Sequence, residues 1–475
     1  MSLTSLSRES TVCQESEQSL ESLVAADACL RCTACLAACP LVEVLPHYAG
    51  PKRLGPDLWR QQQAPAVEDG AGGGHGLFTR RLPDPLPYDL DLCLGCRRCN
   101  LACPSGVEPA RLIALNRLSG RHRHERKTAF RDWFLGRAYL LGKAGTTLRP
   151  LANVMLPTRP VRFALHHVMG ISGERVLPPF ANRRFSSLHQ PSPRPQLPAA
   201  PDTRRSGPPA AAECGRGMLS RKVVYFPGCQ VEYYEPELGE LVLNTLARLG
   251  VETAVDEVAC CGLPLIANAW TKAARDQVTA NVERLLAWVE NGWDVVFSSS
   301  SCGLTVRHDY LSLHLIPPNL REAAARVAEH VYDLGSYLLR LEQDESCRRG
   351  KQVQISPNKA SGVAKHLAGI GYHTPCHVEA AAQGRPWLTL LRRLPDVEVV
   401  DLQAGCCGIA GTYGLKREKY GVARAVGRGL QQAVLALDQP VVATECETCR
   451  MQIRDLVPQA QVMHPLQLLD GLCFV

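Results

Sequence analysis

One short cysteine spacing occurs twice in this chain and restricts what its N-terminal part can fold into. Each copy has the form C-x₂-C-x₂-C-x₃-C-P, which places four cysteines within eleven residues, directly before a proline. The copies are Cys29, Cys32, Cys35, Cys39 with Pro40, and Cys93, Cys96, Cys99, Cys103 with Pro104. Three thiolates on one tight turn can bind three irons of a [4Fe–4S] cube, and the fourth reaches a second cube. The spacing therefore predicts a ferredoxin-type domain with two [4Fe–4S] clusters over residues 25–118.

The fourth cysteine of each copy is expected to bind the cluster of the other copy. This exchange is the arrangement found in two-cluster ferredoxins of the same spacing. The expected iron ligands are Cys29, Cys32, Cys35 and Cys103 for the first cluster, and Cys93, Cys96, Cys99 and Cys39 for the second. Structural zinc is the alternative, although zinc sites favour two C-x₂-C pairs at a wider separation.

The cysteine content as a whole indicates metal binding rather than a disulfide framework. The chain has 21 cysteines in 475 residues, and residues 1–24, an expected flexible tail, lack the basic start and apolar middle of an export signal. We therefore expect a reducing cytoplasm, where closely spaced cysteines act as metal ligands. No apolar run approaches the roughly 18–20 residues that span a bilayer. The sequence has no P-loop and no G-x-G-x-x-G after a strand, so no flavin or nicotinamide site is expected.

Residues 119–181 are expected to form a basic helical segment. Positions 121–170 hold ten Lys or Arg against two acidic residues, and apolar positions recur there at helical spacing near residues 130–141 and 161–169. Basic residues such as Arg131, interleaved with apolar ones, suggest peripheral docking on an anionic membrane surface. The alternative is an ordinary helix pair that packs against the cluster domain and leaves a solvated basic face.

The rest of the chain contains a linker and two copies of one unit. Residues 182–222 are rich in proline, and we expect them to form a linker that buries too little apolar surface to fold. Residues 223–345 and 346–475 each contain a β-rich run ending in cysteine, then Cys-Cys-Gly, then an apolar run leading to another cysteine. Short strands that alternate with helical stretches predict two duplicated α/β units, the first and second CCG units.

The two CCG units differ in their cysteines. The second unit offers Cys376, Cys406, Cys407, Cys446 and Cys449, and the first offers Cys229, Cys260, Cys261 and Cys302. So many soft thiolates in the second unit indicate a further iron–sulfur cluster. When Cys302 is aligned with Cys449, Ser299 stands where Cys446 should be. Whether the first unit binds iron with four cysteines, or keeps only the fold, therefore stays open.

Several longer stretches resemble a known family of iron–sulfur subunits. Two ferredoxin motifs, a linker and two CCG units are the architecture shared by the iron–sulfur subunit of anaerobic glycerol-3-phosphate dehydrogenase, glycolate oxidase iron–sulfur subunits, lactate-utilisation proteins and heterodisulfide reductase subunits. The likeness is strongest to the glycerol-3-phosphate dehydrogenase subunit. It is carried by Gly50-Pro51-Lys52, Gly55-Pro56-Asp57, Cys260 to Asn268, His373 to His377, Cys406 to Gly414 and Thr444 to Cys449.

The resemblance implies a chain that passes electrons and does not itself oxidise a substrate. Electrons would come from a flavoprotein dehydrogenase subunit and go to the membrane quinone pool in anaerobic respiration, at the cytoplasmic face of the inner membrane. It also implies a non-cubane [4Fe–4S] cluster at the five cysteines of the second CCG unit. Catalytic residues are not assigned, although His373, His377 and Tyr413 flank these cysteines and could supply protons to a quinone. The alternatives are a glycolate or lactate oxidase subunit and a heterodisulfide-type reductase.

Overall fold

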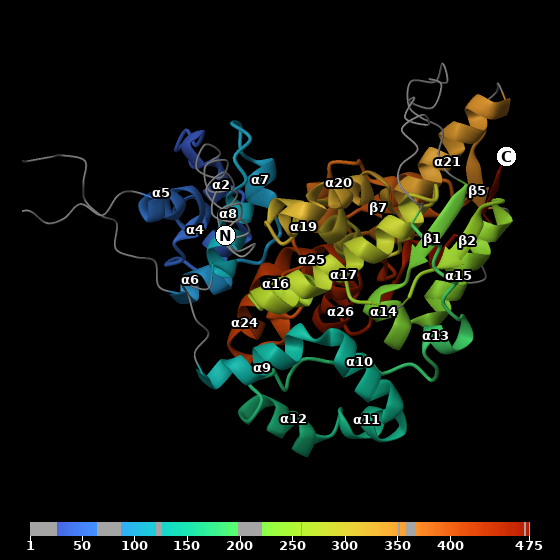
Figure 1. Cartoon of the computed structure of the whole chain (residues 1–475). Helices are drawn as coiled ribbons and strands as arrows, with labels where there is room; N and C mark the ends of the chain where they lie inside the picture. Colours follow the sequence, from blue (N-terminus) through green and yellow to red (C-terminus); the bar gives the residue numbers. More distant parts are fainter. Residues whose placement is uncertain are drawn as a thin grey trace, which may run out of the picture. The chain divides into compact units, whose positions relative to one another are not determined.

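The computed structural model describes residues 26–63, 87–119, 126–197, 221–257, 259–349, 352–357, 367, 369–469 and 472–474. The chain divides into two compact bodies, an N-terminal body of residues 1–125 and a C-terminal body of residues 126–475, which are described separately (Figure 1). The expected tail of residues 1–24 lies outside the described residues.

The described part of the N-terminal body consists of short helices around the cysteine motifs. They are α2 (Ala34–Ala37), α3 (Pro40–Val44), α4 (Gly50–Lys52), the π-helix η1 (Arg53–Asp57), α5 (Leu58–Gln63), α6 (Pro87–Leu92), α7 (Arg98–Leu101) and α8 (Pro109–Leu118). Proline stands in the first turn of α3 and α8. Its missing backbone N–H costs nothing there, because that group would have no hydrogen-bond partner within the helix. Helix α8 packs against η1 and α7, so it holds the second cysteine motif in place.

The C-terminal body begins with the basic helices. They are α9 (Arg126–Gly136), α10 (Ala138–Thr147), α11 (Arg149–Met155) and α12 (Arg159–His167), and a short helix α13 (Phe185–Leu188) follows. One expectation for this segment is wrong, because Arg131 is not a free surface cation. It is 6% exposed and forms ion pairs with Asp132 at 2.9 Å and Glu418 at 2.8 Å, so it anchors α9 to the second CCG unit.

Each CCG unit contains a four-stranded parallel sheet, and the two sheets have the same strand order. The first sheet is ordered β2-β1-β3-β4 and the second β7-β6-β8-β9. The strands are β1 (Lys222–Phe226), β2 (Glu252–Val255), β3 (Asp294–Phe297), β4 (Val331–Asp333), β6 (Gly369–Tyr372), β7 (Glu398–Asp401), β8 (Val441–Ala443) and β9 (Gln461–Met463). The predicted fold class, an N-terminal helical dicluster domain followed by duplicated α/β units, is confirmed.

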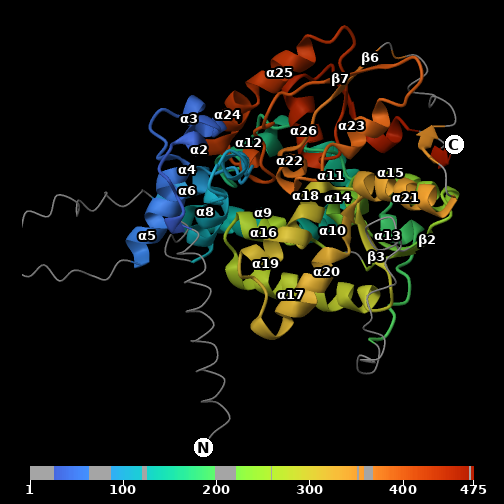
Figure 2. The ribbon, with the colours of Figure 1, turned by 90° about the horizontal axis from the view of Figure 1, so that it is seen from above.

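Helices connect the parallel strands of both sheets (Figure 2). The first unit has α14 (Gly228–Tyr233), α15 (Pro236–Arg248), α16 (Leu263–Ala267), α17 (Thr271–Val289), α18 (Ser300–Leu304), the π-helix η2 (Thr305–Asp309), α19 (Tyr310–Ser312), η3 (Pro318–Leu320), α20 (Arg321–Glu329) and α21 (Leu334–Arg349). The second has α22 (Cys376–Ala381), α23 (Pro386–Leu391), η5 (Tyr413–Leu415), α24 (Arg417–Val426), α25 (Arg428–Leu435), α26 (Glu447–Leu456) and η6 (Pro465–Gln467).

The two CCG units share one hydrophobic core and are not independent domains. One buried cluster joins Val223 and Tyr225 of β1 to Tyr372 of β6 and to Trp387 of α23. The expected boundary between residues 345 and 346 falls inside α21, which packs against α23. The C-terminal strand β10 (Leu472–Phe474) also pairs antiparallel with β5 (Ile355–Pro357), which lies between the two sheets in sequence.

The expected linker is also shorter than residues 182–222. Phe185 of α13 is fully buried in the shared core, because its ring packs edge-on against Tyr225. Further along, Ser192 bonds in both directions with the backbone of Val255 in β2. Residues 182–197 are therefore part of the first CCG unit despite their prolines, and the remainder up to residue 220 lies outside the described residues.

Candidate iron–sulfur sites

The structure brings together the four cysteines expected for the second cluster. Cys39 from the first motif and Cys93, Cys96 and Cys99 from the second line one cavity of about 320 Å³, open solvent included. Burial, with Cys93 and Cys96 nearby, raises the pKa of Cys39 to about 12. A thiol with a raised pKa loses its proton readily only when a metal ion binds the sulfur in place of the proton. This cavity therefore fits a metal cluster.

The other set forms a second group. The Cys35 thiol is buried, and its pKa is raised by that burial and by the nearby thiols of Cys29, Cys103 and Cys32. Cys103 stands in the second motif, so the exchange of the fourth cysteine is present in both groups. Cys35 and Cys99 pack with Ala110 of α8, which lies beside both sites. The iron at these eight cysteines stays a prediction, although their grouping suits two cubes.

The two motifs also adopt the same strained backbone. Arg31 and Gly95, two residues after the first cysteine of each motif, have φ of 56° and 66°, and Thr33 and Arg97 have φ of 66° and 59°. A left-handed conformation costs about 1–3 kcal/mol for a residue other than glycine and persists where a site requires it. At Gly95, the turn directs the backbone N–H toward the Cys93 Sγ at 3.5 Å. These turns wrap the chain around the sulfur atoms.

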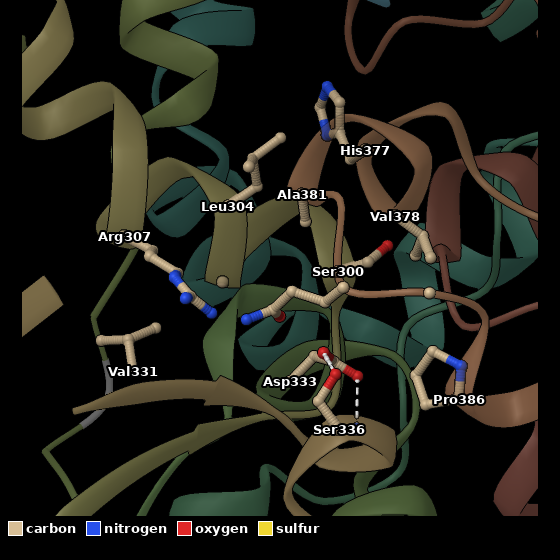
Figure 3. A pocket seen from close by; sticks show the side chains of 13 residues that line it. Ser300, Leu304, Arg307, Val331, Asp333, Ser336, His377, Val378, Ala381 and Pro386 are labelled. Carbon is tan, nitrogen blue, oxygen red and sulfur yellow. Dashed lines mark hydrogen bonds between the residues drawn. The ribbon is translucent and has the colours of Figure 1, made fainter. Parts of the chain in front are cut away.

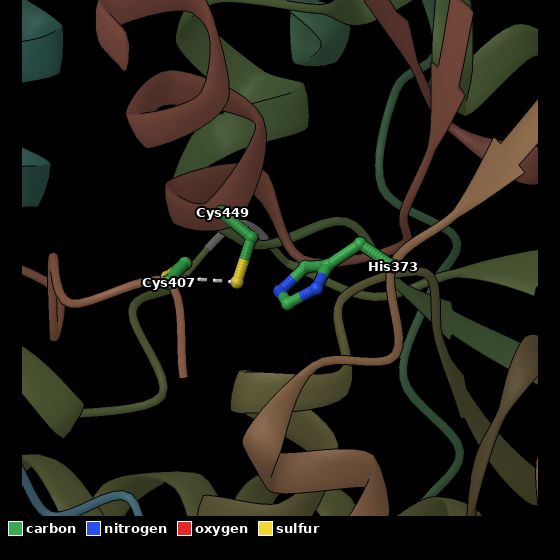
Figure 4. Close-up of side chains that lie close together, drawn as sticks. All are labelled: His373, Cys407 and Cys449. Atoms are coloured by element: carbon green, nitrogen blue, oxygen red, sulfur yellow. Dashed lines mark hydrogen bonds between the residues drawn. The ribbon is translucent and has the colours of Figure 1, made fainter. Parts of the chain in front are cut away.

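The cysteines of the second CCG unit gather at the carboxyl ends of its parallel strands. Cys407 follows β7 and Cys449 lies in α26 after β8, and their Sγ atoms are 3.2 Å apart (Figure 4). Cys446 precedes α26, and hydrogen bonding from Cys449 lowers the pKa of Cys446 to about 6. Cys406 hydrogen-bonds Cys407 and so belongs to the same group. Cys376 begins α22 at the end of β6, as expected of the fifth cysteine.

His373 belongs to this group as well. One ring nitrogen and the sulfur atoms of Cys407 and Cys449 all lie within 4.8 Å of one another (Figure 4). The residue is 1% exposed, and burial lowers its pKa to about 4, so it is neutral at pH 7. A neutral imidazole suits metal ligation or a hydrogen bond to a sulfur atom better than the proton supply suggested by the sequence.

The first CCG unit gathers its four cysteines in the same places. Cys229 lies in α14 after β1, Cys260 and Cys261 follow β2, and Cys302 lies in α18 after β3. Hydrogen bonds connect Cys229 to Cys260 and Cys261 to Cys302, so the four thiols form one buried cluster. Gly262 and Gly408, the glycines of the two Cys-Cys-Gly sequences, have φ of 87° and 90°, which explains why glycine ends both.

Ser299 takes the position of Cys446 in the backbone as well as in the alignment. Ser299 precedes α18 with φ −106° and ψ 119°, and Cys446 precedes α26 with φ −90° and ψ 116°. The Ser299 hydroxyl donates to Glu447 of the second CCG unit, with an Oγ–Oε2 distance of 2.7 Å. The missing thiol is therefore replaced by a contact between the two units.

Two hydroxyl groups near Cys446 were not identified from the sequence. Ser301 Oγ lies 3.5 Å and Thr448 Oγ1 lies 3.3 Å from the Cys446 Sγ. If Cys446 is a thiolate ligand, both hydroxyls donate to its sulfur atom. Thr448 could have been suggested by its place between Cys446 and Cys449. Ser301 carries no local signal, because it comes from the other CCG unit.

Comparison with known proteins agrees with this layout. A model for a 4Fe-4S dicluster domain matches residues 25–107, and a model for a cysteine-rich domain matches residues 223–307 and 370–454. The subunit designated C of anaerobic glycerol-3-phosphate dehydrogenase from Escherichia coli (strain K12) is 32% identical over 445 residues, which cover 93% of this chain and 97% of that protein. The chain belongs to this family. The resemblance inferred from the motifs is thereby confirmed.

More distant relatives match parts of the chain. One subunit of the fumarate reductase (CoM/CoB) of Methanothermobacter marburgensis is 26% identical over 261 residues, 52% of this chain and 46% of that protein. Lactate utilization protein A 2 of Bacillus mycoides is 26% identical over 206 residues, 41% of this chain and 75% of that protein. Family membership and the two matched domains make the chain an iron–sulfur electron-transfer protein.

Proposed function

We propose that this chain is the iron–sulfur subunit that carries electrons from a flavin-dependent glycerol-3-phosphate dehydrogenase to the membrane quinone pool in anaerobic respiration. The observation that carries the proposal is the exchange of the fourth cysteine, since Cys39 lies with Cys93, Cys96 and Cys99 and Cys103 lies with Cys35. Sites that share ligand loops in this way are close together, as single-electron transfer between them requires. A reduced flavin holds two electrons, and iron–sulfur clusters pass them on one at a time.

The second CCG unit is proposed to hold a further [4Fe–4S] cluster. Four of its five cysteines are buried and lie with His373 at the carboxyl ends of parallel strands, the usual location of ligand sites in open α/β sheets. The substrate itself binds the flavoprotein partner in this proposal. The choice of glycerol 3-phosphate over glycolate or lactate therefore rests on the E. coli relative alone.

Reconstitution with the partner tests the proposal. The full chain, purified anaerobically, is mixed with a flavin-dependent glycerol-3-phosphate dehydrogenase, glycerol 3-phosphate and a quinone. We expect quinone reduction only when both proteins are present. Turnover by the chain alone would contradict the proposal, as would preparations without brown absorbance that dithionite bleaches.

We also propose that helices α9–α12 dock the complex on an anionic membrane surface, at the cytoplasmic face of the inner membrane. None of the described helices is long and apolar enough to cross a bilayer. Ten of the sixteen strongly exposed large apolar side chains among the described residues lie between Phe130 and Val176, and Val154, Phe163 and Val168 are 64–82% exposed. Residues 133–173 include five Lys or Arg and no acidic residue. Exposed apolar groups among unbalanced positive charges fit a membrane surface.

Flotation with vesicles tests this docking. Replacing Lys143, Arg149 and Arg159 by Gln should weaken binding to anionic vesicles about a hundredfold, since each such charge contributes about 1 kcal/mol. The matched control replaces three exposed arginines elsewhere in the C-terminal body, Arg275, Arg392 and Arg428. Equal binding by both triple variants would contradict the docking proposal and leave electron transfer untouched.

A self-sufficient reductase remains a second candidate, because a fumarate reductase subunit and a lactate utilization protein are among the relatives that match parts of this chain. This candidate predicts that the isolated chain, given reduced viologen, turns over a disulfide or a carboxylic substrate. The electron-transfer proposal predicts no such turnover.

A further inference from the structure

Two polar side chains in the second CCG unit replace two phenylalanines of the first. His373 aligns with Phe226, three residues before the first cysteine of its unit, and Thr444 aligns with Phe297. Phe226 and Phe297 are register partners in β1 and β3, and their ring centroids lie 4.7 Å apart. His373 and Thr444 stand one position beyond the last register pair of β6 and β8, so they lie on one face of the second sheet. The two units therefore differ in polarity at one equivalent place.

All four side chains are buried, but only the polar pair needs hydrogen-bond partners. The His373 Nε2 and the Thr444 Oγ1 have no such partner among the residues that the structure describes. A buried polar group without a partner is costly, and folded proteins leave few of them. Two such groups side by side, at a place where the first unit has only apolar rings, indicate that the second unit's site supplies acceptors for them.

Water in the neighbouring cavity does not account for these groups. This cavity lies between α18, the β4 end and α22 (Figure 3). It offers about 30 Å³ to water-sized molecules, which is room for one or two of them. Ser300, Asp333 and His377 line it together with apolar side chains, whereas His373 and Thr444 do not. The acceptors therefore have to be found on the side of the cysteines.

The acceptors nearest to the imidazole of His373 are sulfur atoms. Figure 4 shows the ring pointing toward Cys449, and one ring nitrogen lies within 4.8 Å of the sulfur atoms of Cys407 and Cys449. The backbone N–H of His373 donates to the Ala443 carbonyl at 3.0 Å, which fixes the residue at the end of β6. Burial lowers the pKa of the imidazole to about 4, so the ring is neutral at pH 7 and has one N–H to donate.

We propose that the His373 Nε2–H donates a hydrogen bond to a sulfur atom of the second unit's cluster, with the Thr444 hydroxyl as a second donor beside it. This inference rests on the proposed function, since it requires a cluster in the second unit. The five cysteines already outnumber the four irons of such a cluster, so the imidazole is not needed as a ligand.

The consequence of this hydrogen bond is a cluster that is easier to reduce. Reduction adds one electron and makes the sulfur atoms more negative, so a donor beside them stabilises the reduced form. His373 keeps its proton in this step, and no bond is broken. The polar pair therefore raises the potential of this cluster above the value it would have beside two phenylalanines.

Redox titration of the full chain, followed by electron paramagnetic resonance, tests the bond. His373→Phe introduces the residue of the first unit and keeps every cysteine, so the iron content should not change. The one-electron potential of the second unit's cluster should fall by about 59 mV, which corresponds to a tenfold weaker preference for the reduced form. His373→Gln keeps an N–H and should fall less. The control is His189→Phe, at a histidine that packs on Phe185, and its potential should equal that of the wild type.

An unchanged potential in an iron-loaded His373→Phe chain would overturn the inference. Isotope labelling decides the matter if that variant loses iron. The wild type and His373→Gln are both prepared with histidine that carries a heavy nitrogen isotope, and their pulsed paramagnetic resonance spectra are compared. A weak coupling to the labelled nitrogen, present only in the wild type, supports the hydrogen bond.

A strong coupling, as expected of a nitrogen bound to iron, would overturn the inference, and so would identical spectra of the two proteins. None of these results would affect the case for electron transfer by this chain. A second unit without iron would instead refute the further cluster of the proposed function, and this hydrogen bond with it.

Discussion

The first and second CCG units have the same strand order, the same glycine turn and the same arrangement of cysteine-bearing loops. They differ at one residue, which stands directly before α18 in the first unit and directly before α26 in the second. In the second unit this residue is Cys446, whose thiol lies among other cysteines. In the first it is Ser299, whose hydroxyl turns to Glu447 across the interface. Because the backbone angles nearly match, the difference lies in the side chain and not in the fold.

This comparison suggests how a duplicated unit diverges. The first unit directs a second hydroxyl, that of Ser301, to the Cys446 Sγ. It also supplies Glu235, which forms an ion pair with the buried Arg450 of the second unit. The first unit therefore contributes polar groups to its neighbour's site. We infer that the second unit holds the metal while the first mainly supports it.

The largest expected effect separates the two units by iron content. With two cubes and one further cluster, the reconstituted chain should hold about twelve irons. Cys407→Ala should lower this to about eight, because it removes a buried ligand from the second unit. The corresponding change Cys261→Ala should leave the count near that of the wild type. Equal losses in the two variants, measured by iron analysis and electron paramagnetic resonance, would mean that both units hold clusters.

The reverse change sharpens the comparison. If the absent fifth cysteine is what limits the first unit, Ser299→Cys should raise the iron content by up to about four atoms after anaerobic reconstitution. The backbone at Ser299 already matches that of a ligand position. Ser299→Ala is the control, since it also breaks the bond to Glu447 but supplies no thiol. An iron content equal in both variants would show that another feature separates the units.

The sequence alone predicted the features that depend on local spacing. The strands before the cysteine loops and the alignment of Ser299 with Cys446 follow from short patterns. Local chemistry determines such features, because the turn around a cluster and the period of a strand involve neighbouring residues. The ligand sets themselves stay predictions.

Features that depend on which faces meet could not be predicted in this way. Ser301 and Cys446 are 145 positions apart in the sequence, and Arg131 and Glu418 are 287 apart. Phe185 stands in a proline-rich stretch whose composition resembles a linker, but its ring enters a core made by both CCG units. Amino-acid composition indicates whether a stretch as a whole buries much apolar surface. It does not show that one side chain packs into a core formed by residues far away in the sequence.

A smaller effect is expected on stability. Arg450 is 2% exposed, donates to the Thr444 carbonyl at 3.1 Å and pairs with Glu235 of the first unit. Arg450→Met should lower the free energy of unfolding by about 3 kcal/mol, because it leaves a partly buried carboxylate and a carbonyl unpaired. Guanidinium chloride unfolding under anaerobic conditions measures the change. Glu235→Gln keeps a hydrogen-bond acceptor for Arg450, so it should lower the free energy of unfolding by less than Arg450→Met does. An equal decrease in the two variants would mean that the charge of the ion pair accounts for the whole effect.

The smallest expected effect concerns the sulfur atom of Cys446. A hydrogen bond to a ligand sulfur stabilises the reduced cluster, because reduction adds negative charge. Removing one bond, worth about 0.5–1.5 kcal/mol, should lower the one-electron potential by about 20–60 mV. Ser301→Ala and Thr448→Ala should shift the potential of the second unit's cluster alike, although only Thr448 belongs to that unit.

Redox titration followed by electron paramagnetic resonance measures these shifts. Thr389→Ala, at a threonine of α23 whose hydroxyl donates to the Arg385 carbonyl, is the control and should leave the potential unchanged. If Thr448→Ala lowers the potential and Ser301→Ala does not, the first unit has no electronic role at its neighbour's site. Its contribution would then be confined to the contacts of Ser299 and Glu235, and the two units would differ in metal binding without cooperating in it.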